Sequence, residues 1–315
     1  LPEPKDFKTL VGCEQNPYGV ARQYGVPLWS DAHFKLLEAS FKHLGRIGNA
    51  WLNVPVLCKT EYGNQDDSML RWTRKKDGTW AFDFKLLDRY LDTALRNGCA
   101  PKVLHAIVMQ GMKSALNPPE PPQVAVYDEA AAKTVLLDVP SSNKEPWRAF
   151  ALALHGHLKD RGLAKALYWG FPLEAEADPG LKTVLAEATP DVFWTAGPHE
   201  MMSNGTFAKQ DQFYHLVADI RYQGGWKNFR EDKGWKSPTL HLLNPRVGGT
   251  CMTVHTTSHP FAYRVMVDHA LARGWSGFTR VGADEWAGIH YRGMAIPKWL
   301  TGMPVLFTLW PGPDG

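Results

Sequence analysis

Carboxylates that could act as a catalytic pair stand at two places in the second half of the sequence. Asp284 and Glu285 follow Gly282-Ala283, where glycine lets the backbone turn sharply after a strand-like run. Glu174 and Glu176 stand at alternate positions, so in an extended chain their side chains share one face and raise each other's pKa. Such carboxylates can protonate a glycosidic oxygen and offset oxocarbenium charge. We therefore predict acid/base catalysis, with Glu285 as general acid, Asp284 as stabiliser of charge, and Glu174 or Glu176 as the opposing carboxylate.

Polar and aromatic residues after the other apolar runs are the candidates for binding a sugar. A sugar ring presents a C–H face that stacks on indole, and the planar fork of donors on arginine suits a hydroxyl, a carboxylate or a sulfate. The candidates for polar contacts are Arg246, Asn244, His199, Glu200, Glu14, Asn16 and Tyr263, and the candidates for stacking walls are Trp169, Trp194 and Trp286. The alternative is structural: the tryptophans fill the core, Asp284 caps a loop, and Glu285 is solvated.

The composition excludes several other classes of function. The 35 Lys and Arg residues nearly balance the 32 Asp and Glu residues, which leaves no basic stripe for nucleic acid. No run of about 18 apolar residues could span a membrane. The histidines and the 4 cysteines show no metal-binding spacing, so we expect no metal, no cofactor and buried free thiols.

The apolar runs that could position these residues alternate with amphipathic helical stretches. Strands are predicted at 9–13, 50–57, 102–109, 165–170, 192–196, 239–243, 277–281 and 304–310. Helices are predicted from Ser30-Asp31 to Leu44 and at 82–96, 146–160, 181–187, 209–222 and 261–272. Eight alternating strands and helices predict an α/β fold, a (β/α)8 TIM-type barrel, with an open doubly wound sheet as the alternative.

A proline-rich stretch over about 113–145 interrupts the alternation. It carries five prolines and one strand-like segment at 134–137. Because the alternation resumes after it, we predict an insertion within a single domain over 1–315. The chain begins at Leu1 without a signal-like segment, and we expect it to be a processed or excised piece.

Several motifs resemble glycoside hydrolase-like barrels related to family 123. These motifs are Gln15-Asn16-Pro17-Tyr18-Gly19-Val20-Ala21, Tyr24-Gly25-Val26-Pro27-Leu28-Trp29-Ser30, Asp77-Gly78-Thr79-Trp80-Ala81-Phe82-Asp83-Phe84, Asn244-Pro245-Arg246, Arg280-Val281-Gly282-Ala283-Asp284 with Trp286, and Pro311-Gly312-Pro313-Asp314-Gly315. The resemblance extends over nearly the whole chain. It implies a barrel fold, flanking β-sandwich domains outside this sequence, and a secreted or periplasmic bacterial protein.

The resemblance also implies a catalytic mechanism, and this sequence departs from the family pattern at one position of that mechanism. Family 123 enzymes are β-N-acetylgalactosaminidases in which the substrate's acetamido oxygen is the nucleophile and an adjacent Asp-Glu pair ends strand four. The corresponding stretch here reads Gly170-Phe171-Pro172, so that pair is not carried over. The related barrels retain the Gly-Ala-Asp-x-Trp element, which favours Asp284.

The sequence thus predicts a glycosidase that degrades a glycan or polysaccharide, as an exo-acting enzyme on a 2-acetamido sugar. One alternative is a catalytically silent carbohydrate-binding barrel, in which a carboxylate substitution weakens binding only. Another is a uronate-acting lyase that uses Arg246, His199 and Tyr263 and gives an unsaturated product. The oligomeric state is open.

Overall fold

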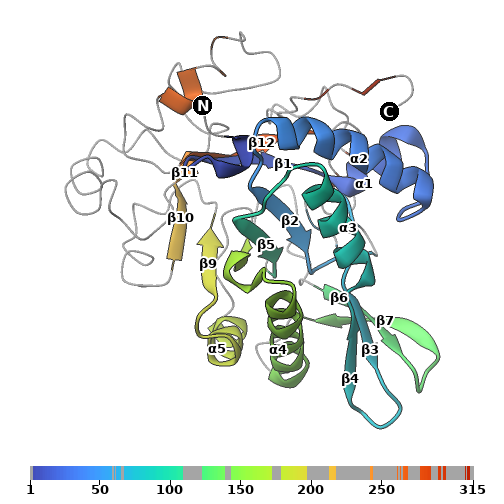
Figure 1. The fold of residues 1–315 in the computed structure, drawn as a ribbon. Helices are drawn as coiled ribbons and strands as arrows, with labels where there is room; N and C mark the ends of the chain where they lie inside the picture. Colours follow the sequence, from blue (N-terminus) through green and yellow to red (C-terminus); the bar gives the residue numbers. More distant parts are fainter. Residues whose placement is uncertain are drawn as a thin grey trace.

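The computed structural model has a mixed α/β fold in which helices cover one face of a long parallel sheet (Figure 1). It describes residues 3–58, 60, 62–64, 67–108, 123–138, 143–171, 179–196, 213–217, 242–243, 261, 263, 265–268, 277–284, 290–291, 294–295, 309 and 311–312. All structural statements below concern these residues.

Eight strands of the described chain form the main sheet, and every pairing in it is parallel. The strands are β1 (Leu10–Glu14), β2 (Trp51–Pro55), β5 (Val103–Ile107), β8 (Leu167–Phe171), β9 (Phe193–Ala196), β10 (Phe213–Val217), β11 (Leu242–Leu243) and β12 (Gly277–Gly282). Their spatial order is β1-β12-β11-β10-β9-β8-β5-β2. Strands β1 and β2, at the two ends of this order, are joined by an isolated bridge between Val11 and Asn49 and by a hydrogen bond from Ala50 N to Val11 O (2.8 Å).

The described helices lie between successive strands of the main sheet along the chain. They are α1 (Pro17–Tyr24), α2 (Asp31–Arg46), α3 (Lys85–Arg96), α4 (Lys144–Asp160) and α5 (Pro179–Ala188), with short 3-10 helices at Pro4–Asp6 and Ala164–Ala166. Asn16 caps α1 through its side chain, and the left-handed Gly25 ends this helix. Ser30 caps α2 by accepting from the backbone N–H of His33, and α2 starts at Asp31, where the sequence predicts a helix start.

The hydrophobic core lies between the helices and the outer face of the sheet. Alternate strand residues such as Leu52, Val54, Leu104 and Ala106 pack there with apolar residues of α2 to α5. The intervening strand residues point to the opposite face, which we call the inner face. There Leu10, Trp51, Val103 and Tyr168 form a separate apolar cluster with Ala50.

A second sheet lies beside the main one, with strand order β4-β3-β6-β7. Its strands are β3 (Arg71–Arg74), β4 (Trp80–Asp83), β6 (Gln123–Asp128) and β7 (Lys133–Asp138). Trp72 fastens this sheet to α4, since its ring stacks on Phe150 at 4.4 Å and meets Trp147 edge-on at 5.2 Å. The predicted insertion therefore supplies half of an accessory sheet.

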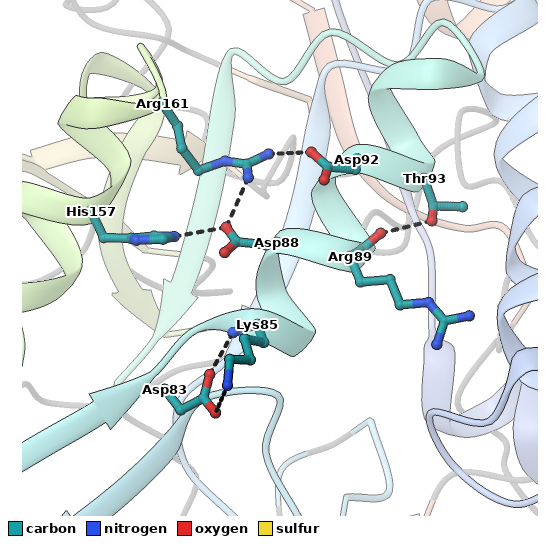
Figure 2. Close-up of polar contacts among 8 residues, drawn as sticks. All are labelled: Asp83, Lys85, Asp88, Arg89, Asp92, Thr93, His157 and Arg161. Carbon is teal, nitrogen blue, oxygen red and sulfur yellow. Dashed lines mark hydrogen bonds and ion pairs between the residues drawn. The ribbon is translucent and has the colours of Figure 1, made fainter.

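Polar contacts join α3 to α4 on the outside of the molecule (Figure 2). Asp88 accepts from His157 Nε2 at 2.7 Å and from Arg161 Nη1 at 2.9 Å, and Arg161 also pairs with Asp92. At the start of α3, the Asp83 carboxylate accepts from the Lys85 backbone N–H at 2.8 Å. These contacts fix the packing of the two helices that follow β4 and β7.

The structure corrects two predicted helices. The predicted helix at 209–222 is wrong, because Phe213–Val217 is strand β10 and pairs with β9 and β11. The predicted helix at 82–96 begins at Lys85, because 80–83 pairs with β3. The predicted strand at 304–310 lies outside the described residues except for Leu309, which is a bend and not part of a strand.

Three cysteines in the described part of the chain, Cys13, Cys58 and Cys99, are buried free thiols, as predicted. Burial raises the pKa of Cys13 and of Cys99 to about 12, which keeps both thiols protonated and unreactive. No helix within the described ranges is long and apolar enough to cross a membrane.

Candidate active site

The carboxyl ends of β1 and β12 lie side by side and bring two predicted site residues together. Glu14 is in register with Gly282, and the Ala283 N–H donates to Glu14 O at 2.8 Å. Asp284 follows directly. Parallel α/β proteins place their sites at this end of the strands, so the predicted location fits the fold.

Asp284 is fully buried, and both of its carboxylate oxygens accept hydrogen bonds from the protein. Oδ1 accepts from the Asn16 backbone N–H at 2.7 Å. Oδ2 accepts from Gln15 Nε2 at 2.9 Å and from Ser40 Oγ at 2.5 Å. The carboxylate therefore links the loop after β12 to the end of β1 and to the middle of α2.

Tyr90 of α3 extends this network. Its hydroxyl donates to Gln15 Oε1 at 2.7 Å, which leaves the Gln15 amide nitrogen to donate to Asp284. Asn16 contributes its backbone N–H to Asp284, while its side chain caps α1 by accepting from Gly19 N at 3.0 Å. Asn16 thus has a structural role, beside the sugar contact predicted for it.

Burial raises the pKa of Asp284 from 3.8 to about 6, although the three hydrogen bonds from Asn16, Ser40 and Gln15 oppose this rise. The group is therefore mostly ionised at neutral pH and takes up a proton as pH falls through about 6. Since its oxygens face internal donors and have no exposed surface, the geometry suits a carboxylate that holds the backbone directly after β12 rather than one that touches a sugar.

Glu14 occupies the inner face at the carboxyl end of β1. Strand alternation places it on the same face as Leu10 and Gly12, opposite to Cys13 of the main core. Its side chain is buried. Glu14 thus stands at the carboxyl end of its strand, the end at which parallel sheets bind their ligands.

Two of the predicted stacking walls lie in the core instead. Trp169 has no exposed surface, contacts Phe150 of α4, and donates from Nε1 to Thr189 Oγ1 at 2.9 Å. Trp194 belongs to the same cluster. Both side chains point to the outer face of the sheet, so neither indole can stack on a sugar, and the structural alternative holds for them.

One further predicted site residue, Tyr263, belongs to the described part of the chain. Tyr263 is helical and half-buried against the main core, where burial raises its pKa. The other candidates lie outside the described residues, and their roles stay predictions: Glu285, Glu174, Glu176, Arg246, Asn244, His199, Glu200 and Trp286.

Sequence reasoning missed a polar group on the inner face. Asn53 of β2 and His105 of β5 are directly paired in register, and Asn53 bonds Tyr62 of the loop after β2. A signal was available, because each polar residue interrupts an apolar strand at the position that alternation assigns to one face. The described residues hold no group of three or more His, Cys, Asp or Glu side chains that could bind a metal ion.

Comparison with known proteins identifies a family for nearly all of the chain. The family described as "Glycoside hydrolase 123, catalytic domain" matches residues 15–315. None of the curated proteins compared with the chain matches it.

A solved structure has a similar fold. It is that of a family 123 glycoside hydrolase from Clostridium perfringens, studied for the details of glycolipid glycan hydrolysis. The two share 17% sequence identity at a TM-score of 0.72, over 99% of this chain and 56% of the other. This chain thus spans about half the length of that enzyme. The match across 15–315 shows that the chain belongs to glycoside hydrolase family 123 and carries its catalytic domain.

Proposed function

We propose that the chain hydrolyses glycosidic bonds in a glycan, as an exo-acting enzyme that releases a 2-acetamido sugar. The observation that carries this proposal is the match of the family 123 catalytic domain over residues 15–315. The similar enzyme from Clostridium perfringens was studied for glycolipid glycan hydrolysis, which supports a glycan as the substrate class. The 2-acetamido specificity rests on the motifs shared with the family.

We further propose that the main sheet closes into a (β/α)8 barrel. The spatial order of its strands follows the chain order around the sheet, and all of its pairings are parallel. The bridge between Val11 and Asn49 joins the two end strands and supports closure. In such a barrel the inner face becomes the lumen, and Glu14 and the loop after β12 stand at its catalytic mouth.

The proposed division of labour among the carboxylates follows from the burial of Asp284. Glu285 is the general acid, and Asp284 is a positioning residue that fixes the backbone beside it through Asn16, Gln15 and Ser40. Glu174 or Glu176, after β8, supplies the opposing carboxylate. Arg246 and Glu14 are proposed to bind sugar hydroxyls or the acetamido group.

A catalytically silent carbohydrate-binding domain is the second candidate, and one observation favours it. Strand β8 ends at Gly170-Phe171 and Pro172 follows, where the resemblance to family 123 implies an Asp-Glu pair. A chain without an acid at this strand could keep the sugar site and lose the chemistry.

The test is hydrolysis of aryl α- and β-glycosides of N-acetylgalactosamine, N-acetylglucosamine, galactose and glucuronic acid. Wild type is compared with Glu285→Gln, Glu174→Gln and Glu176→Gln, and with Lys85→Gln, an exposed substitution on α3, as the matched control. Turnover of one glycoside, lost in at least one Glu variant and kept in the control, supports the proposal. Sugar binding without turnover of any glycoside favours the binding domain.

A further inference from the structure

The inner face of the main sheet carries a row of polar and glycine residues in its middle. Alternation places Gly12 of β1, Asn53 of β2, His105 of β5, Gly170 of β8 and Thr195 of β9 on this face. The corresponding interior layers of parallel barrels are dominated by branched apolar side chains. Buried polar groups cost stability unless they are hydrogen-bonded, so the partners of these side chains decide what this layer can do.

Asn53 is the centre of a hydrogen-bond chain on this face. Its Oδ1 accepts from Trp51 Nε1 at 2.8 Å and lies 3.0 Å from His105 Nδ1, and its Nδ2 donates to the Tyr62 hydroxyl at 2.7 Å. Asn53, His105 and Tyr62 are each only 1% exposed. Strands β2 and β5 lie side by side, which holds the pair in register (Figure 1).

The direction of each hydrogen bond around Asn53 follows from the atoms that can only donate or only accept. Indole Nε1 can only donate, so the oxygen of the Asn53 amide faces Trp51 and the nitrogen faces Tyr62. An amide oxygen can only accept, so the hydrogen shared with His105 sits on Nδ1. A neutral imidazole with its hydrogen on Nδ1 presents Nε2 as an acceptor, and Tyr62, which accepts from Asn53, points its own hydrogen elsewhere.

His105 Nε2 faces the end of β8. A Cβ at Gly170 would lie 2.5 Å from Nε2 and closer than 3.0 Å to Thr195 Oγ1, so the imidazole and the hydroxyl fill the space of a side chain at that position. The polar groups of β5 and β9 thus meet beside the carboxyl end of β8, the end of the strands at which parallel α/β proteins place their sites.

We propose that Asn53 and His105 are positioning residues for glycoside hydrolysis, fixing the hydrogens of Tyr62 and of the imidazole beneath the catalytic strand ends. This role rests on the proposed function. Asn53 sets the hydrogen-bonding state of Tyr62 in the loop after β2, and it holds His105 as an acceptor toward β8. In this role neither residue needs to contact the sugar.

The test reverses the direction of one hydrogen bond, between position 53 and Tyr62, with almost no change in side-chain volume. In Asn53→Asp both side-chain oxygens accept, so the Tyr62 hydroxyl turns its hydrogen toward position 53. We expect kcat on the responsive glycoside to fall about tenfold or more with little change in KM, since misplaced groups at a site lower the chemical step. Tyr62→Phe gives a similar loss, and the double variant loses no more than Tyr62→Phe alone.

Asn49→Asp is the matched control. Asn49 is also a buried asparagine. Its side-chain oxygen accepts from Cys13 N and its nitrogen donates to Trp51 O, so it makes none of the hydrogen bonds around Asn53. The control is expected to lower the melting temperature and to keep kcat. In parallel, long-range ¹H–¹⁵N NMR of the wild type, with His105→Gln to assign the signal, should report a neutral imidazole with its hydrogen on Nδ1.

Several outcomes would overturn the positioning role alone: an active wild type whose His105 carries its hydrogen on Nε2, a folded Asn53→Asp or Tyr62→Phe with wild-type kcat, or an equal loss of kcat in Asn49→Asp. A wild type that turns over no glycoside would instead overturn the proposed function, and this role with it, even where NMR shows hydrogen on Nδ1. The NMR measurement and Tyr62→Phe decide the matter should Asn53→Asp fail to fold.

Discussion

Replacing Asp284 by asparagine should remove a pH dependence of stability that its burial creates. The raised pKa means that the folded chain holds the proton more tightly than the unfolded chain does. Stability from this group is therefore fully present below the unfolded pKa of 3.8 and is lost as pH rises through about 6. The rise corresponds to about 3 kcal/mol of unfolding free energy, since each tenfold change in proton affinity is worth about 1.4 kcal/mol.

The assay is urea unfolding of wild type and Asp284→Asn at a series of pH values from 3.8 to above 6. Other titrating groups cancel in the difference between the two proteins, so the unfolding free energy of wild type should fall by about 3 kcal/mol relative to the variant across this window. Ser40→Ala removes a hydrogen bond that lowers the pKa of Asp284, so it should extend the window to higher pH. Parallel pH profiles for wild type and Asp284→Asn would refute the reasoning.

Three further predictions concern the packing around the site. Gly170→Ala should lower the unfolding free energy by about 1–3 kcal/mol, because the added Cβ would collide with two inner-face side chains. Gly156→Ala in α4 should raise it by about 0.5–1 kcal/mol, because the added Cβ would meet no atom within 4 Å. Thermal unfolding measures both changes. Trp169→Phe should lower the melting temperature, since it breaks the bond to Thr189, and leave KM for the glycoside unchanged; a raised KM would place the indole at the sugar after all. In native protein at most one of the 4 thiols should react with a thiol reagent, because three are buried; two or more reacting before unfolding would contradict this.

Most of the main sheet could be predicted from the sequence because its strands are short apolar runs with clear ends. Strand β10 could not, since the run Phe213–Val217 sits within a stretch whose apolar residues also fit a helical period, and periodicity cannot separate the two at this length. Hairpin β3–β4 leaves only the turn-forming dipeptide Asp77-Gly78 as a sequence signal, because its strands carry charged residues.

Part of the candidate site could likewise be predicted from the sequence, and part could not. Asp284 could be found from the glycines before it, but its hydrogen bonds come from Gln15 and Ser40, more than two hundred residues away in the sequence, so its burial could not be read from local pattern. Trp169 and Trp194 were misplaced because strands covered on both faces are apolar throughout, and the sequence does not mark which side faces the helices. Inner-face Asn53 and His105 were predictable in principle from alternation.

The central claim is that this protein uses water to cleave a glycosidic bond of its substrate. The direct test is to incubate the chain with an oligosaccharide ending in a 2-acetamido sugar in H₂¹⁸O and to analyse the released sugar by mass spectrometry, with the free sugar in the same water as the control for exchange. Hydrolysis predicts one ¹⁸O atom in the released sugar at an early time, before the control takes up label. An unlabelled unsaturated product absorbing in the near ultraviolet, or binding without any release, would contradict the claim.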